Sequence, residues 1–419
     1  MAIIKPFKAY RPVKELASKI AALPYDVMNT EEAREMVEEN EYSFLHVDRG
    51  EINFPGKVNI YSEEVYKKSR EVLDEMIEKK YYIQDENQCF YIYRQTMNGK
   101  SQIGLVMCAS VDDYINNIIK KHEKTRADKE RDRINHVDYC DAHTGPIFLT
   151  YRENYGISKI IDESIKEEPV YDFISEDGNG HTVWVINDEE KINKLTHLFK
   201  DVKYMYIADG HHRTKSAVEV CLKRRKENPN YNGTEGFNYF LAIAYPDSEL
   251  EVLDYNRTVK DLNGLSKEAF FKAVEEKFTV EKTLNNERFK PDSKHTFGMY
   301  IDKEWYKLEA KEGSFDENDP TDRLDVSILQ NNLLSPILGI DDPTKSDRIE
   351  FIGGIRGLKE LEKRANNDMR VSFAMYATTI EDIMSIADAG KIMPPMIKAE
   401  PFRRIPQSCK PTAFLLRLP

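Results

Sequence analysis

The densest set of chemically capable side chains in this 419-residue chain follows a short apolar run at residues 204–208. The run has the length and composition of a buried strand, and the residues after it have helical spacing. A helix that begins directly after a strand presents free backbone N–H groups and the positive end of its dipole, which favour an anion. Glycine admits a close approach, arginine suits phosphate, and a carboxylate can hold Mg²⁺ or accept a hydroxyl proton. The pattern predicts a phosphate site at Asp209, Gly210, His211, His212 and Arg213. The alternative is that Asp209 caps the helix and the histidines are ordinary polar surface.

A second cationic stretch lies at residues 122–136, inside a segment, 110–144, that has no glycine or proline and is expected to be mostly helical. On a helix, cationic or titratable residues at positions 122, 126, 129, 133 and 136 share one face, because their intervals are 4, 3, 4 and 3. The alternative is a solvated face whose charges are balanced by neighbouring acids. The stretch predicts these phosphate contacts: His122, Lys124, Thr125, Arg126, Lys129 and Arg133.

Two carboxylates are candidate catalytic groups. Asp26 follows Pro24 in a short loop before a predicted helix at residues 30–40, where it is either a turn residue or a base. Asp209 is the other candidate, and it is also the predicted ligand of Mg²⁺. Ser43 and Arg356 are weaker candidates for substrate contacts, and Arg356 could equally form a surface ion pair.

Composition narrows the possible partners. The net charge of −12 disfavours general binding to nucleic acid or anionic membranes, so positive charge must be gathered locally. No apolar run reaches the roughly 18 residues of a membrane span. The five cysteines are scattered without a CxxC pair, which is typical of a reducing, cytoplasmic location. The sequence has no P-loop, GxGxxG, GxSxG or HExxH motif, so the common phosphotransferase and hydrolase types are excluded.

The elements expected around these residues are mixed. Strand-like segments at 89–94 and 103–109 flank Asn98 and Gly99, which predicts a hairpin, and residues 43–47 resemble a short strand. The fold class predicted is α+β with mixed sheets. Three regions are expected: an N-terminal α/β part at 1–110, a phosphate-site region at 111–260, and a C-terminal α/β region at 261–419.

Several long motifs in one order resemble a large, mainly bacterial family of unknown function, from residue 1 to about residue 395. They include PYDV at 24–27, YSFLHV at 42–47, HEKTRADKERDR at 122–133, ADGHHR at 208–213 and FIGGIRG at 351–357. The tail after Met393 departs from the family's usual ending.

The ADGHHR element also resembles the active-site motif of free L-serine kinases of the ParB/sulfiredoxin-like superfamily. That resemblance implies a ParB/sulfiredoxin-like core, with phosphate held by His211, His212 and Arg213. It also implies a catalytic or metal role for Asp209 and a base at Asp26, with Glu31 and Glu32 as rivals.

The function expected is phosphorylation of free L-serine to O-phospho-L-serine, with Mg²⁺ and with pyrophosphate, ATP or ADP as donor. Two alternatives stay open. One is a metal-dependent phosphohydrolase that uses Asp209, His211 and His212, and the other is a non-catalytic ParB-like nucleotide-binding switch.

Overall fold

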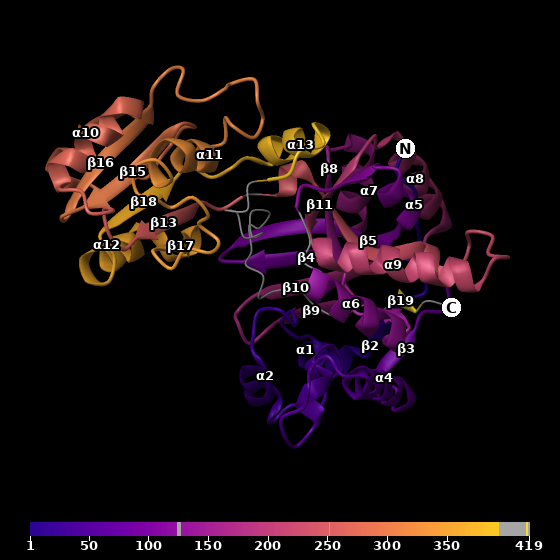
Figure 1. Cartoon of the computed structure of the whole chain (residues 1–419). Coiled ribbons are helices and arrows are strands. Elements are labelled where there is room, and N and C mark those ends of the chain that lie inside the picture. Colours follow the sequence, from indigo (N-terminus) through magenta and orange to yellow (C-terminus); the bar gives the residue numbers. More distant parts are fainter. Residues whose placement is uncertain (124–126, 251, 394–415, 418–419) are drawn as a thin grey trace. The chain divides into compact units, whose positions relative to one another are not determined.

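A computed structural model describes residues 1–123, 127–250, 252–393 and 416–417 (Figure 1). The chain divides into two compact units, Met1–Leu250 with Arg404–Pro419, and Glu251–Arg403. Strands and helices are interspersed along the chain in both units, and the sheet of the first unit is mixed. The predicted α+β class with mixed sheets is therefore confirmed. None of the helices in the described ranges has the length and apolarity that a bilayer span requires.

The first unit is built on a nine-stranded mixed sheet of order β6-β11-β8-β12-β5-β4-β10-β9, with β1 paired to β5. Its central strands are buried over most of their length, and many of their apolar side chains belong to one large core cluster. The strands are β1 (Ile4–Lys5), β4 (Phe90–Met97), β5 (Lys100–Ser110), β6 (Ile119–Lys120), β8 (Ile147–Tyr151), β9 (Tyr171–Ile174), β10 (Gly180–Ile186), β11 (Met205–Asp209) and β12 (Tyr239–Pro246).

The predicted hairpin is confirmed. Met97 pairs with Lys100, so Asn98 and Gly99 form the two-residue turn between β4 and β5. Both have positive φ, 51° for Asn98 and 76° for Gly99. A type I′ turn demands this conformation, and Asn-Gly adopts it readily.

Two helices carry the cationic motifs. Helices α6 (Ala127–Cys140) and α9 (His211–Glu227) lie side by side against the sheet (Figure 1). Residues 110–144 are mostly helical, as expected, but they form two helices, because α5 (Val111–Ile115) is followed by Asn117, whose φ is 58°, and by β6 before α6 begins. His122 therefore precedes α6 and does not share its face. The other helices of this part are α7 (Tyr155–Ser164) and α8 (Glu189–Asp201).

The N-terminal region adds short helices beside α6. Asn29 begins α2 with a capping box, because its side chain accepts from the Glu32 N–H while the Glu32 carboxylate accepts from the Asn29 N–H. The segment expected as a strand at 43–47 is instead mostly α3; its short apolar run fits either period. The elements here are β2 (Tyr10–Pro12), α1 (Ala17–Ile20), α2 (Thr30–Val37), α3 (Leu45–Asp48), α4 (Glu63–Glu78) and β3 (Tyr82–Gln84).

A small two-stranded sheet pairs β7 (Ala142–His143) with β19 (Leu416–Arg417) in antiparallel orientation. The turn that follows β7, residues 144–146, leads directly into β8.

The second unit is a six-stranded antiparallel sheet of order β14-β16-β15-β18-β13-β17. Trp305 and Phe297 are fully buried in its core. Its elements are β13 (Tyr255–Val259), α10 (Lys267–Lys277), β14 (Phe278–Lys282), β15 (Thr296–Ile301), β16 (Glu304–Ala310), α11 (Asp325–Leu329), β17 (Ile349–Gly353), α12 (Gly357–Asn367), β18 (Val371–Met375) and α13 (Ile380–Asp388).

Candidate functional site

The strand–helix junction forms as the sequence predicts. Strand β11 ends at Asp209, Gly210 adopts φ 93°, and α9 begins at His211. Arg213 turns back over this junction, where one Nη donates to Asp209 Oδ2 at 2.6 Å and the other to the carbonyl oxygen of Pro146 at 2.6 Å. Arg213 therefore joins the end of β11 to the beginning of β8.

Gly210 is required by both conformation and space. Its φ lies in the left-handed region, and a Cβ there would sit 3.1 Å from an Nη of Arg213. We expect Gly210→Ala to lower the free energy of unfolding of the first unit by about 2 kcal/mol, through the left-handed penalty plus displacement of Arg213. Urea denaturation measures the change.

Gly99→Ala is the matched control for this substitution. Gly99 also has positive φ, but a Cβ there would meet nothing within 4 Å. It should lose only the conformational part, about 1 kcal/mol. Equal losses for the two variants would contradict a role for the Arg213 contact.

The two cationic stretches meet beside α9. The rings of His122 and His211 are perpendicular with centroids 4.6 Å apart, and the Ser216 hydroxyl oxygen lies 3.4 Å from the carbonyl oxygen of Glu130. Burial lowers the pKa of His211 to about 4 and that of His122 well below its ordinary value. Both imidazoles are therefore neutral at physiological pH. They can hydrogen-bond an anion but add no charge to it.

Arg133 is a buried cation of α6. The residue is 8 % exposed, and its Nε donates to Asp132 Oδ2 at 2.9 Å. The guanidinium carbon lies 3.9 Å from the centre of the Tyr25 ring. A stacked, ion-paired arginine has a fixed orientation, which suits it to a planar anionic group.

Tyr25, Arg133 and His136 lie at the boundary of two adjoining cavities. The larger has a volume of about 220 Å³ and is lined by charged side chains from three segments. The smaller, of about 30 Å³, reaches the residue 144–146 turn and Arg213, and it shares Tyr25, Asp48, Arg133 and His136 with the larger. The charged residues lining the larger cavity include Asp26, Asp48, Arg49, Glu51, Asp132 and Arg133.

Asp48 is the residue that sequence reasoning missed. It lies at the end of α3, is 5 % exposed, and accepts a hydrogen bond from Thr144 Oγ1 at 2.9 Å. Burial raises the pKa of its carboxyl to about 6, against the opposing effects of the Arg133 charge and the Thr144 hydrogen bond. A signal was available, because Asp48 directly follows the YSFLHV motif.

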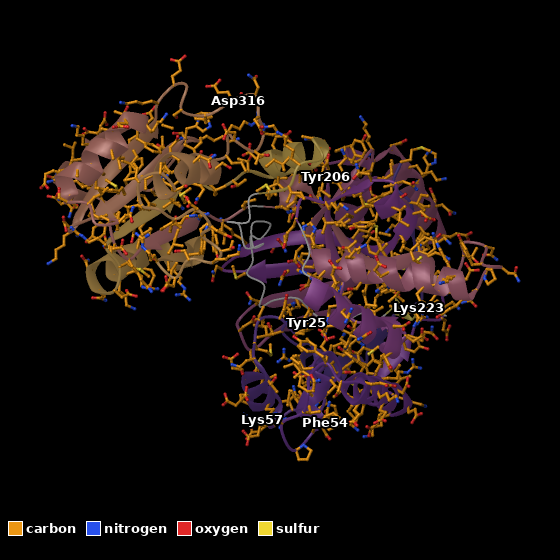
Figure 2. The ribbon with its side chains drawn as sticks, in the orientation of Figure 1. Tyr25, Phe54, Lys57, Tyr206, Lys223 and Asp316 are labelled. Atoms are coloured by element: carbon orange, nitrogen blue, oxygen red, sulfur yellow. The ribbon has the colours of Figure 1, made fainter. Side chains whose placement is uncertain are left out.

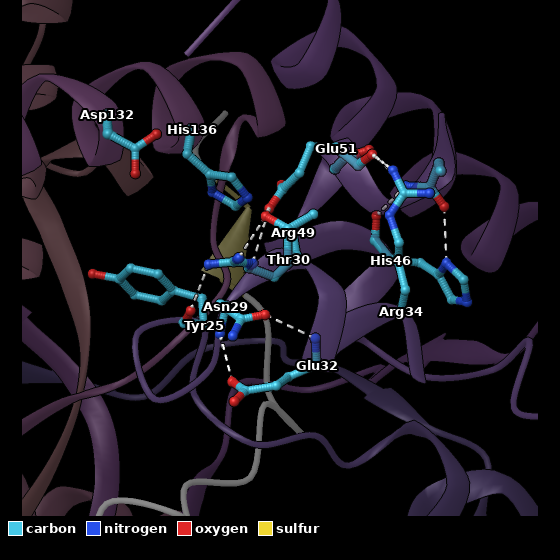
Figure 3. A network of polar contacts seen from close by, with 12 residues as sticks. Tyr25, Asn29, Thr30, Glu32, Arg34, His46, Arg49, Glu51, Asp132 and His136 are labelled. Carbon is cyan, nitrogen blue, oxygen red and sulfur yellow. Dashed lines mark hydrogen bonds and ion pairs between the residues drawn. The ribbon is translucent and has the colours of Figure 1, made fainter. Parts of the chain in front are cut away.

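Arg49 lines the larger cavity and lies at the centre of a polar network (Figure 3). Arg49 donates to the Tyr25 carbonyl oxygen at 3.0 Å and to Thr30 Oγ1 at 3.1 Å, and its Nε lies 2.9 Å from Glu51 Oε1. Figure 2 shows Tyr25 on the side of this region that faces α6, and Phe54 and Lys57 at its outer end. The network fixes the loop that carries Asp26.

The remaining predicted residues are placed as follows. Asp26 is exposed and lines the larger cavity, whereas Glu32 is engaged in the α2 capping box. Ser43 is buried in the turn before α3, where its hydroxyl accepts from the Leu45 N–H at 3.3 Å. Arg356 belongs to the second unit.

Among the other predicted phosphate contacts, the structure describes the surroundings of some residues and not of others. Half-buried His212 begins α9 together with His211, and its carbonyl oxygen accepts from Ser216. Lys124, Thr125 and Arg126 lie outside the described residues, as does the side chain of Lys129. Their phosphate roles stay predictions.

Metal binding was predicted at Asp209. That carboxylate is 8 % exposed and ion-paired with Arg213. Within the described ranges no three His, Cys, Asp or Glu side chains are grouped as a metal site would group them. The role of Asp209 toward Mg²⁺ stays a prediction.

The chain belongs to the family described as protein of unknown function DUF1015, which it matches over residues 4–327. This agrees with the family resemblance seen in the motifs. No curated protein matches the chain.

Solved structures similar to the chain include a free serine kinase in complex with AMP, at 12 % identity and a TM-score of 0.33, covering 70 % of this chain and 84 % of that one. A mutant free serine kinase in complex with ADP matches at 12 % identity and a TM-score of 0.34, covering 71 % of this chain and 86 % of that one. A truncated SbnI from Staphylococcus aureus matches at 10 % identity and a TM-score of 0.34, covering 69 % and 80 %.

Proposed function

We propose that this protein is a phosphotransferase that moves a phosphoryl group from a phosphoanhydride donor to the hydroxyl of free L-serine. The observation that carries the proposal is one pair of adjoining cavities to which Asp26, Asp48, Arg133 and Arg213 all contribute. Phosphoryl transfer needs this combination, because it depends on a positioned hydroxyl and on neutralised phosphoryl charge.

The acceptor would occupy the larger cavity. Its lining carries both acidic and basic side chains, among them Asp26, Glu51 and Arg49. A zwitterionic amino acid presents the complementary pair, an ammonium group and a carboxylate. Asp48 would accept the proton of the serine hydroxyl, because burial places its pKa, about 6, close to a neutral working pH. Asp26 would orient the hydroxyl at the exposed side.

The donor's phosphates would contact Arg133, Arg213 and the first N–H groups of α9. Arg133 is shared by both cavities, so it can contact the phosphoryl group as it moves from donor to acceptor. The α9 N-terminus adds its dipole at the same place.

Mg²⁺ fits this arrangement as a shared ion. It usually keeps several waters and takes one or two carboxylates plus the substrate's phosphate oxygens, so a dedicated protein cage is not needed. Exposed Asp26, which lines the larger cavity, would hold it there, with Asp209 as the second candidate. When bound, the ion would neutralise developing phosphoryl charge.

The test uses the full chain with Mg²⁺, L-serine and, separately, pyrophosphate, ATP and ADP. Phosphorus NMR and mass spectrometry follow formation of O-phospho-L-serine. We expect phosphoserine with at least one donor and no product when serine is omitted. Phosphate release without phosphoserine would favour the phosphohydrolase alternative, and donor binding without turnover would favour the nucleotide-binding switch.

A further inference from the structure

The turn between β7 and β8, residues 144–146, contacts both halves of the site. Thr144 Oγ1 donates to Asp48 Oδ1 at 2.9 Å, and the carbonyl oxygen of Pro146 accepts from Arg213 at 2.6 Å. Thr144 is 7 % exposed, so water does not compete for its hydroxyl. Three residues of backbone thus connect the proposed proton acceptor to an arginine of the proposed phosphate site.

We propose that Thr144 is a positioning residue, whose hydroxyl fixes the Asp48 carboxylate in the direction from which it accepts the substrate's proton. This inference rests on the proposed function, because it assigns a role within the same reaction. Thr144 would act through Asp48 and would not touch the reacting atoms.

The geometry supports this assignment in two ways. Thr144 engages Oδ1 of Asp48, and Asp48 lines both cavities, which leaves the second carboxylate oxygen for a ligand. A hydrogen bond to the ionised carboxylate also stabilises that form, so Thr144 lowers the pKa that burial has raised. The charged and titratable groups that act on Asp48 or line the cavities with it are Tyr25, Asp26, Arg49, Glu51, Tyr61, Tyr66, Tyr82, Asp132, Arg133, His136, His143 and Arg213.

Thr144 would assist the transfer of the phosphoryl group to the serine hydroxyl. The serine oxygen forms a bond to the phosphorus of the phosphoanhydride donor, and the bond from that phosphorus to its bridging oxygen breaks. The leaving phosphate keeps the electron pair of the broken bond. The hydroxyl proton passes to Asp48, which later releases it to water.

Thr144→Val tests the inference, because valine keeps the shape of threonine and removes the hydroxyl. We expect the acidic limb of the kcat–pH profile to move upward by about one pH unit, and kcat at pH 6 to fall about fivefold. The KM for the donor should change less than about twofold, since Arg133 and Arg213 are untouched. Thr144→Ser, which retains the hydroxyl, should restore the wild-type profile.

Thr150→Val is the matched control. Thr150 is fully buried on β8, and its hydroxyl has no hydrogen-bond partner among the described residues, so its loss should leave the pH profile unchanged. A wild-type profile for Thr144→Val in an active enzyme would overturn the inference and leave the proposed function standing. A uniform loss at every pH, shared by Thr144→Ser, would also overturn it, because it would indicate a purely structural role. Absence of phosphoryl transfer in the wild type would overturn both.

Discussion

Asp48→Asn is expected to reduce kcat for phosphoryl transfer by about 1,000-fold, the usual contribution of a general base. Asparagine keeps the size of the side chain and can still accept from Thr144 Oγ1, but it cannot take a proton. Asp48 is buried with a pKa raised to about 6, so its neutral replacement should not lower the thermal midpoint. The measurement is kcat at pH 7.5, with circular dichroism to confirm folding.

Asp113→Asn is a close control for this variant. Asp113 is 4 % exposed, burial raises its pKa to about 6, and it accepts from the Ile3 N–H at 2.6 Å. It lies on α5 and lines neither of the two cavities described here. We expect Asp113→Asn to keep kcat within about twofold of the wild type. Similar kcat losses in both variants would remove Asp48 from the mechanism.

Sequence patterns located the parts of the site that depend on local structure. The junction at Asp209 and Gly210 could be predicted because a buried strand, a glycine and a helix start are consecutive in the chain. The helix expected at residues 30–40, which the structure gives as α2 (Thr30–Val37), was predictable for the same reason. A local motif carries its own geometry, so no tertiary information was needed.

Contacts between residues that are far apart in the sequence could not be predicted, because only the fold brings these residues together. Thr144 and Asp48 are 96 positions apart, and only the packing of α3 against the β7–β8 turn brings them into contact. The helical-face argument for His122 and Arg133 also had the wrong basis. His122 contacts His211 from the irregular segment after β6, whereas Arg133 lines the cavity from α6.

Arg213 shows a further limit of motif reasoning. Its type and place correctly indicated a cation at the helix start, but not that the side chain is held by Asp209 and the Pro146 carbonyl oxygen. Hydrogen bonds to distant backbone atoms leave no trace in residue spacing. The structure therefore adds a positioning function to a residue first predicted only to bind phosphate.

In the second unit, Asp325→Asn is expected to raise the free energy of unfolding by about 4 kcal/mol above pH 8. Asp325 is 7 % exposed; its Oδ1 accepts from the His295 N–H at 2.8 Å, and within the described part of the chain its Oδ2 has no hydrogen-bond partner. Burial raises the pKa of this carboxyl to about 7, and the nearby Asp382 charge adds to the effect. Asparagine removes the cost of burying the ionised form.

The sign follows from comparing the two states. The carboxyl has its ordinary pKa of 3.8 when unfolded and about 7 when folded, so the folded state binds the proton more tightly. Stability contributed by this group is therefore present below about pH 4 and is lost as pH rises to about 7. His295 acts oppositely below its ordinary pKa of 6.5, because its own pKa is lowered by burial. The difference between wild type and variant isolates Asp325.

The chain offers a specific probe for this measurement. It has two tryptophans, Trp184 in the first unit and Trp305 in the second, so a Trp184→Phe background reports the second unit alone. Urea unfolding followed by Trp305 fluorescence at pH 5 and pH 8.5 should give a gain for Asp325→Asn that is larger at the higher pH. An equal gain at both values would mean that Asp325 stays ionised in the fold. A net loss at pH 8.5 would mean that its charge stabilises the second unit.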